Sequence, residues 1–133
     1  MKRFFGSMLA ATLLVATAVM AANVTFGQVV DGVDSRKNTK LASKQYWKSV
    51  EGQEVSWTGE VVDVDGGSKK AKLYVADKSR PLYKGYNIVV ITLDVAKAAA
   101  LKKGQTVRFR GLLDDYDQKD QGAVVEVVEA SIL

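Results

Sequence analysis

Apolar and polar residues alternate with period two through most of the chain after residue 53, and this pattern predicts β-strands. In the first strand, Val55, Trp57, Gly59 and Val61 share one face. The adjacent Val61 and Val62 then move the alternation to the other face. A glycine followed by such a shift is typical of a bulge or bend in a long strand. Further strands are predicted over residues 71–76, 86–93, 105–113 and 123–132.

One helix is predicted before the first strand, and a second one between the third and fourth strands. Residues 38–50 are expected to form a short helix, and an alanine-rich segment over residues 95–103 a second one. Asp94 is a candidate N-cap for the second helix, and Gly104 stands where a helix-terminating glycine is common. Residues 23–34 contain glycines and a short apolar patch, and we expect an extended arm there.

The N-terminal residues have the pattern of an export signal. Lys2 and Arg3 precede an uncharged, mostly apolar run over residues 4–20, and the small residues Ala21 and Ala22 follow as cleavage positions. An uncleaved membrane anchor is the alternative, although the run is shorter than the ~20 apolar residues of a membrane span. We therefore expect a signal peptide over residues 1–21, an arm and short helix over 22–49, a barrel over 50–133, and a periplasmic or secreted location.

Composition excludes most enzyme classes. The chain has no His and no Cys, which removes imidazole bases, thiol nucleophiles, disulfides and the usual zinc sites. We expect no catalytic activity and no cofactor. Removing residues 1–21 takes away two cations and no acid, so the net charge falls from +4 to +2. Binding to a polyanion then requires local clustering of cations.

Two motifs carry a resemblance to a known family. The first is the Val55-x-Trp57-x-Gly59-x-Val61 pattern, and the second is the Leu101-x-x-Gly-x-x-Val-x-x-x-Gly111 run. Both resemble OB-fold domains of the tRNA-anticodon-binding-like group, which is nucleic-acid-binding-like and also occurs in small exported bacterial proteins. The resemblance implies a mostly β protein: a five-stranded OB-like Greek-key barrel with a helix between strands three and four.

OB-folds hold extended polymers on strands two and three and on the loops between strands one and two and between four and five. Cations interleaved with aromatic rings on these elements suit single-stranded nucleic acid or a stacked sugar. The alternative is that the lysines keep the domain soluble, the tyrosines pack a barrel rim, and the arginines form a solvated face paired with Glu126 or Glu129. The candidate ligand-binding residues are Lys69, Lys70, Lys72, Tyr74, Arg80, Tyr86, Arg108 and Arg110.

An acidic loop is expected over residues 114–122, where an OB-fold ligand loop belongs. Its four carboxylates would repel a phosphate backbone. Asp115, Asp117 and Asp120 are weak candidates for Ca²⁺ ligands, since Ca²⁺ prefers oxygen donors, but their spacing does not match an EF-hand. A plain solvated loop is the alternative.

Two functions of different classes fit the sequence. The first is an exported, non-catalytic OB-fold binding module for an oligomeric ligand, which is an oligonucleotide, an oligosaccharide or a protein segment. The second is a structural or assembly protein of the cell envelope that acts through its N-terminal arm or a barrel edge. A calcium-dependent nuclease is disfavoured because Leu93 and Asp94 lead straight into the helix, without the acidic run of such enzymes. No oligomeric state is indicated.

Overall fold

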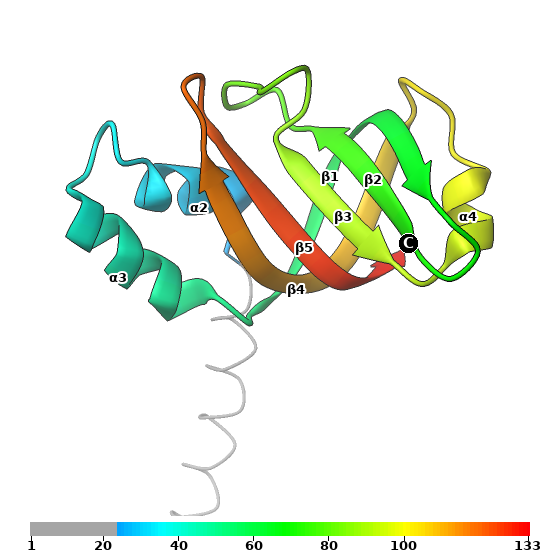
Figure 1. Ribbon diagram of the computed structural model, residues 1–133, viewed down its shortest axis with the longest axis horizontal. Coiled ribbons are helices and arrows are strands. Elements are labelled where there is room, and N and C mark those ends of the chain that lie inside the picture. The colour runs from blue at the N-terminus through cyan, green and yellow to red at the C-terminus, as the bar shows by residue number, and fades with distance from the viewer. Residues whose placement is uncertain (1–23) are drawn as a thin grey trace, which may run out of the picture.

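Five strands form a closed barrel in the computed structural model, which describes residues 24–133 (Figure 1). The expected export signal and its cleavage site lie outside the described residues. Neighbouring strands follow the order β1-β2-β3-β5-β4; β3 and β5 are parallel, and the other pairs are antiparallel. The strands are β1 (Glu54–Gly66), β2 (Ala71–Ala76), β3 (Ile88–Thr92), β4 (Thr106–Gln118) and β5 (Ala123–Ile132). A short helix, α4 (Val95–Ala99), joins β3 to β4, and the predicted OB-like barrel is confirmed.

The barrel closes because β1 changes partner along its length. Up to Glu60 it pairs with β4, and from Glu60 onwards it pairs with β2, with a register shift between Val61 and Asp63. Gly59 lies at the changeover, where a Cβ atom would overlap the side chain of Val75 and approach the Ala76 carbonyl oxygen to 3.0 Å. The predicted bulge thus lies two residues beyond the glycine, and the missing side chain lets the strands come close together.

The expected extended arm is wrong, because residues 26–33 form a helix. Helix α2 (Phe26–Val33) begins with a capping box in which Thr25 and Gln28 satisfy each other's backbone N–H groups. Its apolar side chains have the helical spacing i, i+3, i+4, i+7, and all four are buried: Phe26, Val29, Val30 and Val33. With a helical arm and a closed barrel, neither the arm nor an open edge among the described strands offers the strand pairing that the assembly hypothesis required.

Helix α2 is part of the barrel core. The Phe26 ring packs edge-on against Trp57 with 5.4 Å between ring centroids, and the Trp57 indole N–H donates to the Val24 carbonyl at 2.9 Å. Helix α3 (Lys40–Val50) is capped by Thr39 and packs Trp47 against Tyr116 of β4 at 5.0 Å. In Figure 1, α2 and α3 lie at one end of the barrel and α4 at the other.

Two predicted elements end well away from their predicted last residues. Helix α4 ends at Ala99 instead of residue 103, and Gly104, with φ of +87°, turns the chain before β4. Strand β4 runs on to Gln118, so residues 114–118 are strand and only residues 119–122 form the hairpin tip. Within residues 24–133, none of the helices combines the length and apolarity needed to cross a membrane.

Candidate ligand groove

A groove of about 230 Å³ crosses the outer face of β3, β5 and the distal half of β4. The strand order positions its floor, because β5 pairs with β3 on one side and with β4 on the other. Glu126 of β5 therefore lies opposite both Val89 and Asp115. The groove is lined by Tyr86, Val89, Asp115, Tyr116, Asp117, Lys119, Val124 and Glu126. This includes the strand-three surface and the hairpin after strand four, where the OB-fold resemblance implies a ligand.

Tyr86 lines this groove and packs against two further tyrosine rings outside it. Tyr74 of β2 packs edge-on against Tyr86 with centroids 4.9 Å apart, and Tyr86 packs against Tyr83 at 5.9 Å. The ammonium groups of Lys84 and Lys119 lie 5.3 Å and 4.8 Å from the centre of the Tyr83 ring. These contacts hold the rings in fixed positions beside the groove.

The groove carries excess negative charge. Three carboxylates line it against one ammonium, and that ammonium, on Lys119, is paired with Asp117 at 2.7 Å. Burial raises the pKa of the Glu126 carboxyl above its usual range. A hydrogen bond from the protonated Glu126 carboxyl to Asp114 and the negative charges of Asp114 and Asp115 raise this pKa further, while Lys72 lowers it. Ionised Glu126 thus lacks a compensating cation close enough to offset these effects.

Replacing Glu126 with glutamine is expected to stabilise the protein at neutral pH by about 0.5 kcal/mol, the scale of facing like charges on adjacent strands. Because the pKa of Glu126 is raised on folding, this carboxyl is protonated to a greater extent in the folded protein than in the unfolded chain between pH 4.5 and its folded-state pKa. Stability is therefore lost as pH rises through this window. Urea unfolding should show a gain for E126Q at neutral pH that disappears below pH 4.5. The same gain in E54Q, at the exposed start of β1, would contradict a local cause.

The structure brings together some of the predicted site residues and separates others. Lys72 and Tyr74 lie on the outer side of β2, opposite Ile91 and Val89 of β3, and Tyr74 contacts Tyr86. Lys69 and Lys70 are exposed in the turn before β2. Lys72 and Tyr74 therefore lie on the strand next to the groove, whereas Lys69 and Lys70 lie at the end of β2 that pairs with Thr92, away from Tyr86.

Arg108 and Arg110 lie on β4, which is a neighbour of β1 and β5 but not of β2 or β3. They face Thr58 and Ser56 of β1, and Ser131 of β5 lies opposite Arg110. The two arginines are thus separated from the tyrosines. The alternative pairing of the arginines with Glu126 or Glu129 is not seen: among the described residues neither arginine forms an ion pair, and Glu126 lies opposite Asp115.

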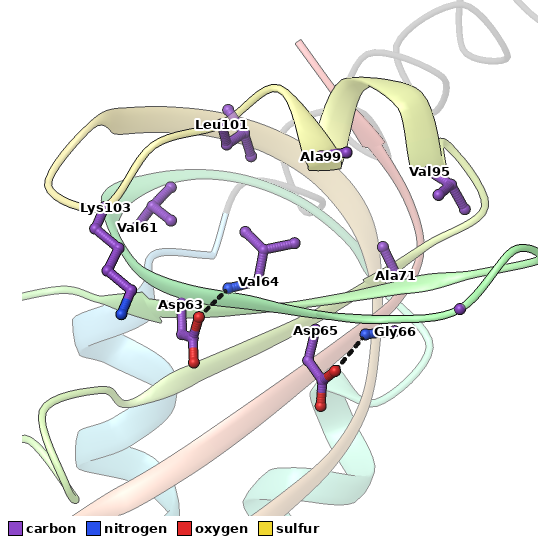
Figure 2. Close-up of a pocket in the computed structure, with 11 residues that line it drawn as sticks. Val61, Asp63, Val64, Asp65, Gly66, Ala71, Val95, Ala99, Leu101 and Lys103 are labelled. Atoms are coloured by element: carbon purple, nitrogen blue, oxygen red, sulfur yellow. Dashed lines mark hydrogen bonds between the residues drawn. The ribbon is translucent and has the colours of Figure 1, made fainter.

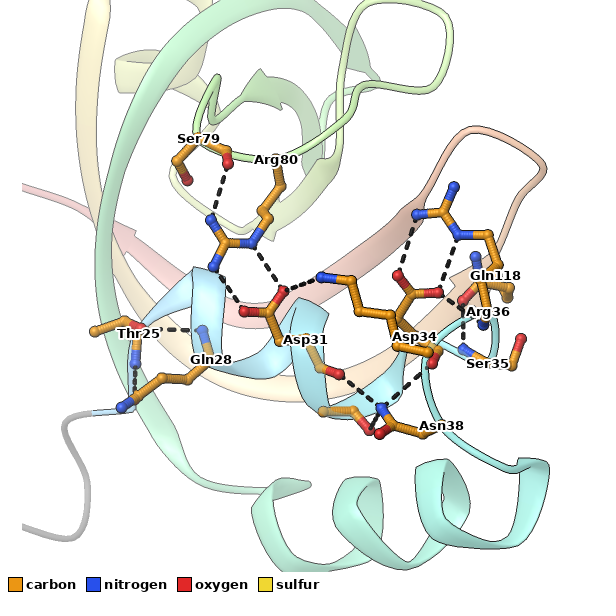
Figure 3. A network of polar contacts seen from close by, with 12 residues as sticks. Thr25, Gln28, Asp31, Asp34, Ser35, Arg36, Asn38, Ser79, Arg80 and Gln118 are labelled. Carbon is orange, nitrogen blue, oxygen red and sulfur yellow. Dashed lines mark hydrogen bonds and ion pairs between the residues drawn. The ribbon is translucent and has the colours of Figure 1, made fainter.

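The candidate Arg80 contacts α2 instead of the groove. Its guanidinium donates twice to the Asp31 carboxylate, at 3.0 Å and 2.8 Å, which together with Lys37 lowers the pKa of Asp31 (Figure 3). Because both hydrogen bonds join groups 49 residues apart in the chain, the sequence held no local signal for this pair.

A second contact ties the N-terminal helices to the hairpin between β4 and β5. The buried Asp34 carboxylate accepts hydrogen bonds from the Arg36 guanidinium, which lowers the pKa of Asp34, and Arg36 also donates to the carbonyls of Asp120 and Gln121. Figure 3 shows this network reaching the loops on both sides of α2. Sequence reasoning missed Asp31, Asp34 and Arg36, which fix the loops bordering the groove.

The structure does not collect the three calcium candidates. Asp115 and Asp117 are on β4, whereas Asp120 is at the hairpin tip, where its carbonyl accepts from Arg36. Among residues 24–133, no group of three or more His, Cys, Asp or Glu side chains is arranged to hold a metal ion.

A larger cavity of about 450 Å³ separates β1 from α4 (Figure 2). Its apolar side is formed by Val61, Val64 and Leu101, and the carboxylates of Asp63 and Asp65 leave β1 on the other side. Each carboxylate accepts from the N–H of the following residue, at 2.9 Å and 2.7 Å. The carboxylates therefore bond to the backbone of β1 and do not point towards the apolar side of this cavity.

Several solved structures are similar to this chain. A lipoprotein from Klebsiella pneumoniae subsp. pneumoniae MGH 78578, named as a candidate nucleic-acid-binding protein, matches with a TM-score of 0.54 and 13% identity, over 84% of this chain and 90% of that one. Asparaginyl-tRNA synthetase from Pyrococcus horikoshii matches with a TM-score of 0.45 and 20% identity, over 64% of this chain and 20% of the synthetase. Schizosaccharomyces pombe Pot1pC bound to single-stranded DNA matches with a TM-score of 0.42 and 14% identity, over 63% and 81%.

No protein-family model and no curated protein matches the sequence. The lipoprotein match has a TM-score above 0.5 and a low identity, so it bears on the fold alone. The closed barrel, the helix between β3 and β4, and the lipoprotein match together show that the chain has an OB-fold.

Proposed function

We propose that the chain is an exported, non-catalytic OB-fold binding module whose groove binds an extended protein segment through a basic side chain. The observation that carries the proposal is the lining of the groove: tyrosine rings and three carboxylates against one ammonium that is already paired. Export rests on the N-terminal sequence pattern, and the absence of catalysis rests on the lack of His and Cys.

The size of the groove favours part of an oligomer over a free small molecule. Its volume of about 230 Å³ is below the roughly 300–1,000 Å³ of small-molecule sites. Such a groove admits one side chain of a longer ligand that continues across the strands. OB-fold surfaces characteristically hold ligands of this extended kind.

The charge of the groove favours a cation. A lysine or arginine entering it meets Asp115 and Glu126, which face each other across β4 and β5, and lies beside Tyr86 and Tyr116. It would offset the negative charges of Asp114 and Asp115, which add to the effect of burial in raising the pKa of Glu126, and would gain attraction from the Tyr86 ring. A phosphate backbone in the same place would add to the repulsion.

Single-stranded nucleic acid is the second candidate, favoured by β2, the strand next to the groove. Lys69, Lys70 and Lys72 precede Tyr74 in and just before this strand, and cations next to an aromatic ring suit an unpaired base and its phosphate. The names of the structural neighbours agree with this candidate, whereas the carboxylates of the groove count against it.

Binding of four fluorescent probes distinguishes these candidates: an oligolysine, an oligoglutamate, an oligothymidine and a neutral oligosaccharide. We expect oligolysine to bind and to weaken with salt. The double substitution D115N/E126Q should weaken it about tenfold, since two half-exposed charge pairs contribute roughly 0.7 kcal/mol each.

The matched control is D63N/D65N, which removes the same charge from β1 and should leave oligolysine binding unchanged. Equal losses in both variants would show that only net charge acts. Preferred binding of oligothymidine would replace the proposal with the nucleic-acid candidate, and salt-insensitive binding of the oligosaccharide would also overturn it.

A further inference from the structure

Helix α3 presents a row of lysines on its outer face. Lys40, Lys44 and Lys48 follow one another at intervals of four, so they lie on one side of the helix, and all three are exposed. The helix contains no acidic residue. None of the three lysines takes part in an ion pair within the described residues, although Lys37, Lys78, Lys97 and Lys119 do. Because the net charge after removal of residues 1–21 is only +2, binding to a negatively charged partner requires a local cluster of cations, and these three lysines form one.

The same outer face carries an exposed apolar side chain and no aromatic ring. Leu41 is 66% exposed and lies on the helix surface next to the lysines. The aromatic Trp47 is turned inwards, buried against Tyr116. The outer face therefore lacks a stacking platform for bases, while lysines around a single leucine suit a surface that is negatively charged outside and apolar beneath.

We propose that the lysine face of α3, formed by Lys40, Lys44 and Lys48 with Leu41, docks onto the headgroups of anionic phospholipids. In this arrangement the ammonium groups contact phosphates and Leu41 enters the headgroup layer. Figure 1 shows α3 at the outer end of the molecule, on the side of α2 away from α4. A flat surface can thus approach the helix without meeting the barrel.

The expected affinity is modest and electrostatic. A lysine near an anionic leaflet contributes about 1 kcal/mol, so three together change binding about a hundredfold. Added salt should weaken the contact, because the charges are exposed and screened.

The test is co-sedimentation of residues 22–133, which include the whole described core, with vesicles of phosphatidylglycerol and phosphatidylcholine in equal parts or of phosphatidylcholine alone. We expect binding to the anionic vesicles at low salt and about a hundredfold loss in K40Q/K44Q/K48Q. The matched control, K69Q/K70Q/K102Q, removes three exposed lysines elsewhere and should still bind. Unfolding midpoints establish that both variants are folded.

Equal loss in the two triple variants, equal binding to both kinds of vesicle, or no binding at low salt would each overturn the proposal. So would an oligothymidine that binds through these lysines in preference to the anionic vesicles. The groove variant D115N/E126Q should bind anionic vesicles as the unsubstituted chain does, so the lipid and groove proposals can fail separately.

Discussion

Replacing Phe26 with alanine is expected to lower the free energy of unfolding by about 4 kcal/mol, within the usual range for a buried phenylalanine. Phe26 is only 3% exposed and packs its ring edge-on against Trp57 at the end of the barrel. Truncation leaves a cavity between α2 and β1 and removes an aromatic pair. Because domains of this size have about 5–15 kcal/mol of stability, urea unfolding followed by circular dichroism should show a large shift.

The matched control for Phe26 is Leu41, which is also apolar and helical but 66% exposed. L41A should change the free energy of unfolding by no more than about 0.5 kcal/mol. If F26A destabilised the protein as little as L41A does, α2 would be a loosely attached segment instead of part of the core.

The strands were predictable because their pattern is local. Alternation with period two places one side of each strand in the barrel, and Val55, Trp57 and Val61 of β1 are all buried as expected. The N-cap at Asp94 was also visible, and its side chain accepts from the Lys97 N–H at 3.3 Å.

Helix α2 was missed although its apolar spacing is helical, because its two glycines favoured an extended arm. The structure gives a different reason for each glycine. A Cβ atom at Gly32 would collide with the Tyr46 ring of α3, and one at Gly27 would lie 2.8 Å from the Arg80 guanidinium. Both glycines permit close contacts with distant segments, which no local pattern can reveal.

The candidate site was only partly predictable, because strand order decides which outward residues are neighbours. Alternation alone places Tyr74 and Arg108 on outer faces, but the order β1-β2-β3-β5-β4 separates them. The polar residues 114–118 resemble a loop in sequence, yet pairing with β5 makes them strand. That pairing brings Asp115 opposite Glu126 and changes the character of the groove from basic to acidic.

Replacing Gly111 with alanine is expected to destabilise the protein by about 3 kcal/mol, at the upper end of the cost of overpacking. A Cβ atom there would lie 2.7 Å from a Val127 methyl carbon, 2.7 Å from the Val128 carbonyl oxygen and 3.1 Å from the Ala130 Cα. Two of these three atoms belong to the β5 backbone, so a change of rotamer cannot make room. The β4–β5 register also shifts between Arg110 and Leu112, and separating the strands would disturb the closure of the barrel.

Gly67→Ala is the matched control for Gly111, because a Cβ atom at Gly67 would meet nothing within 4 Å. Its free energy of unfolding in urea should differ from that of the unsubstituted protein by about 0.5 kcal/mol at most. If G111A were as stable as G67A, β4 and β5 would have room for a side chain at their closest approach. Closure of the barrel would then not depend on a glycine at this position.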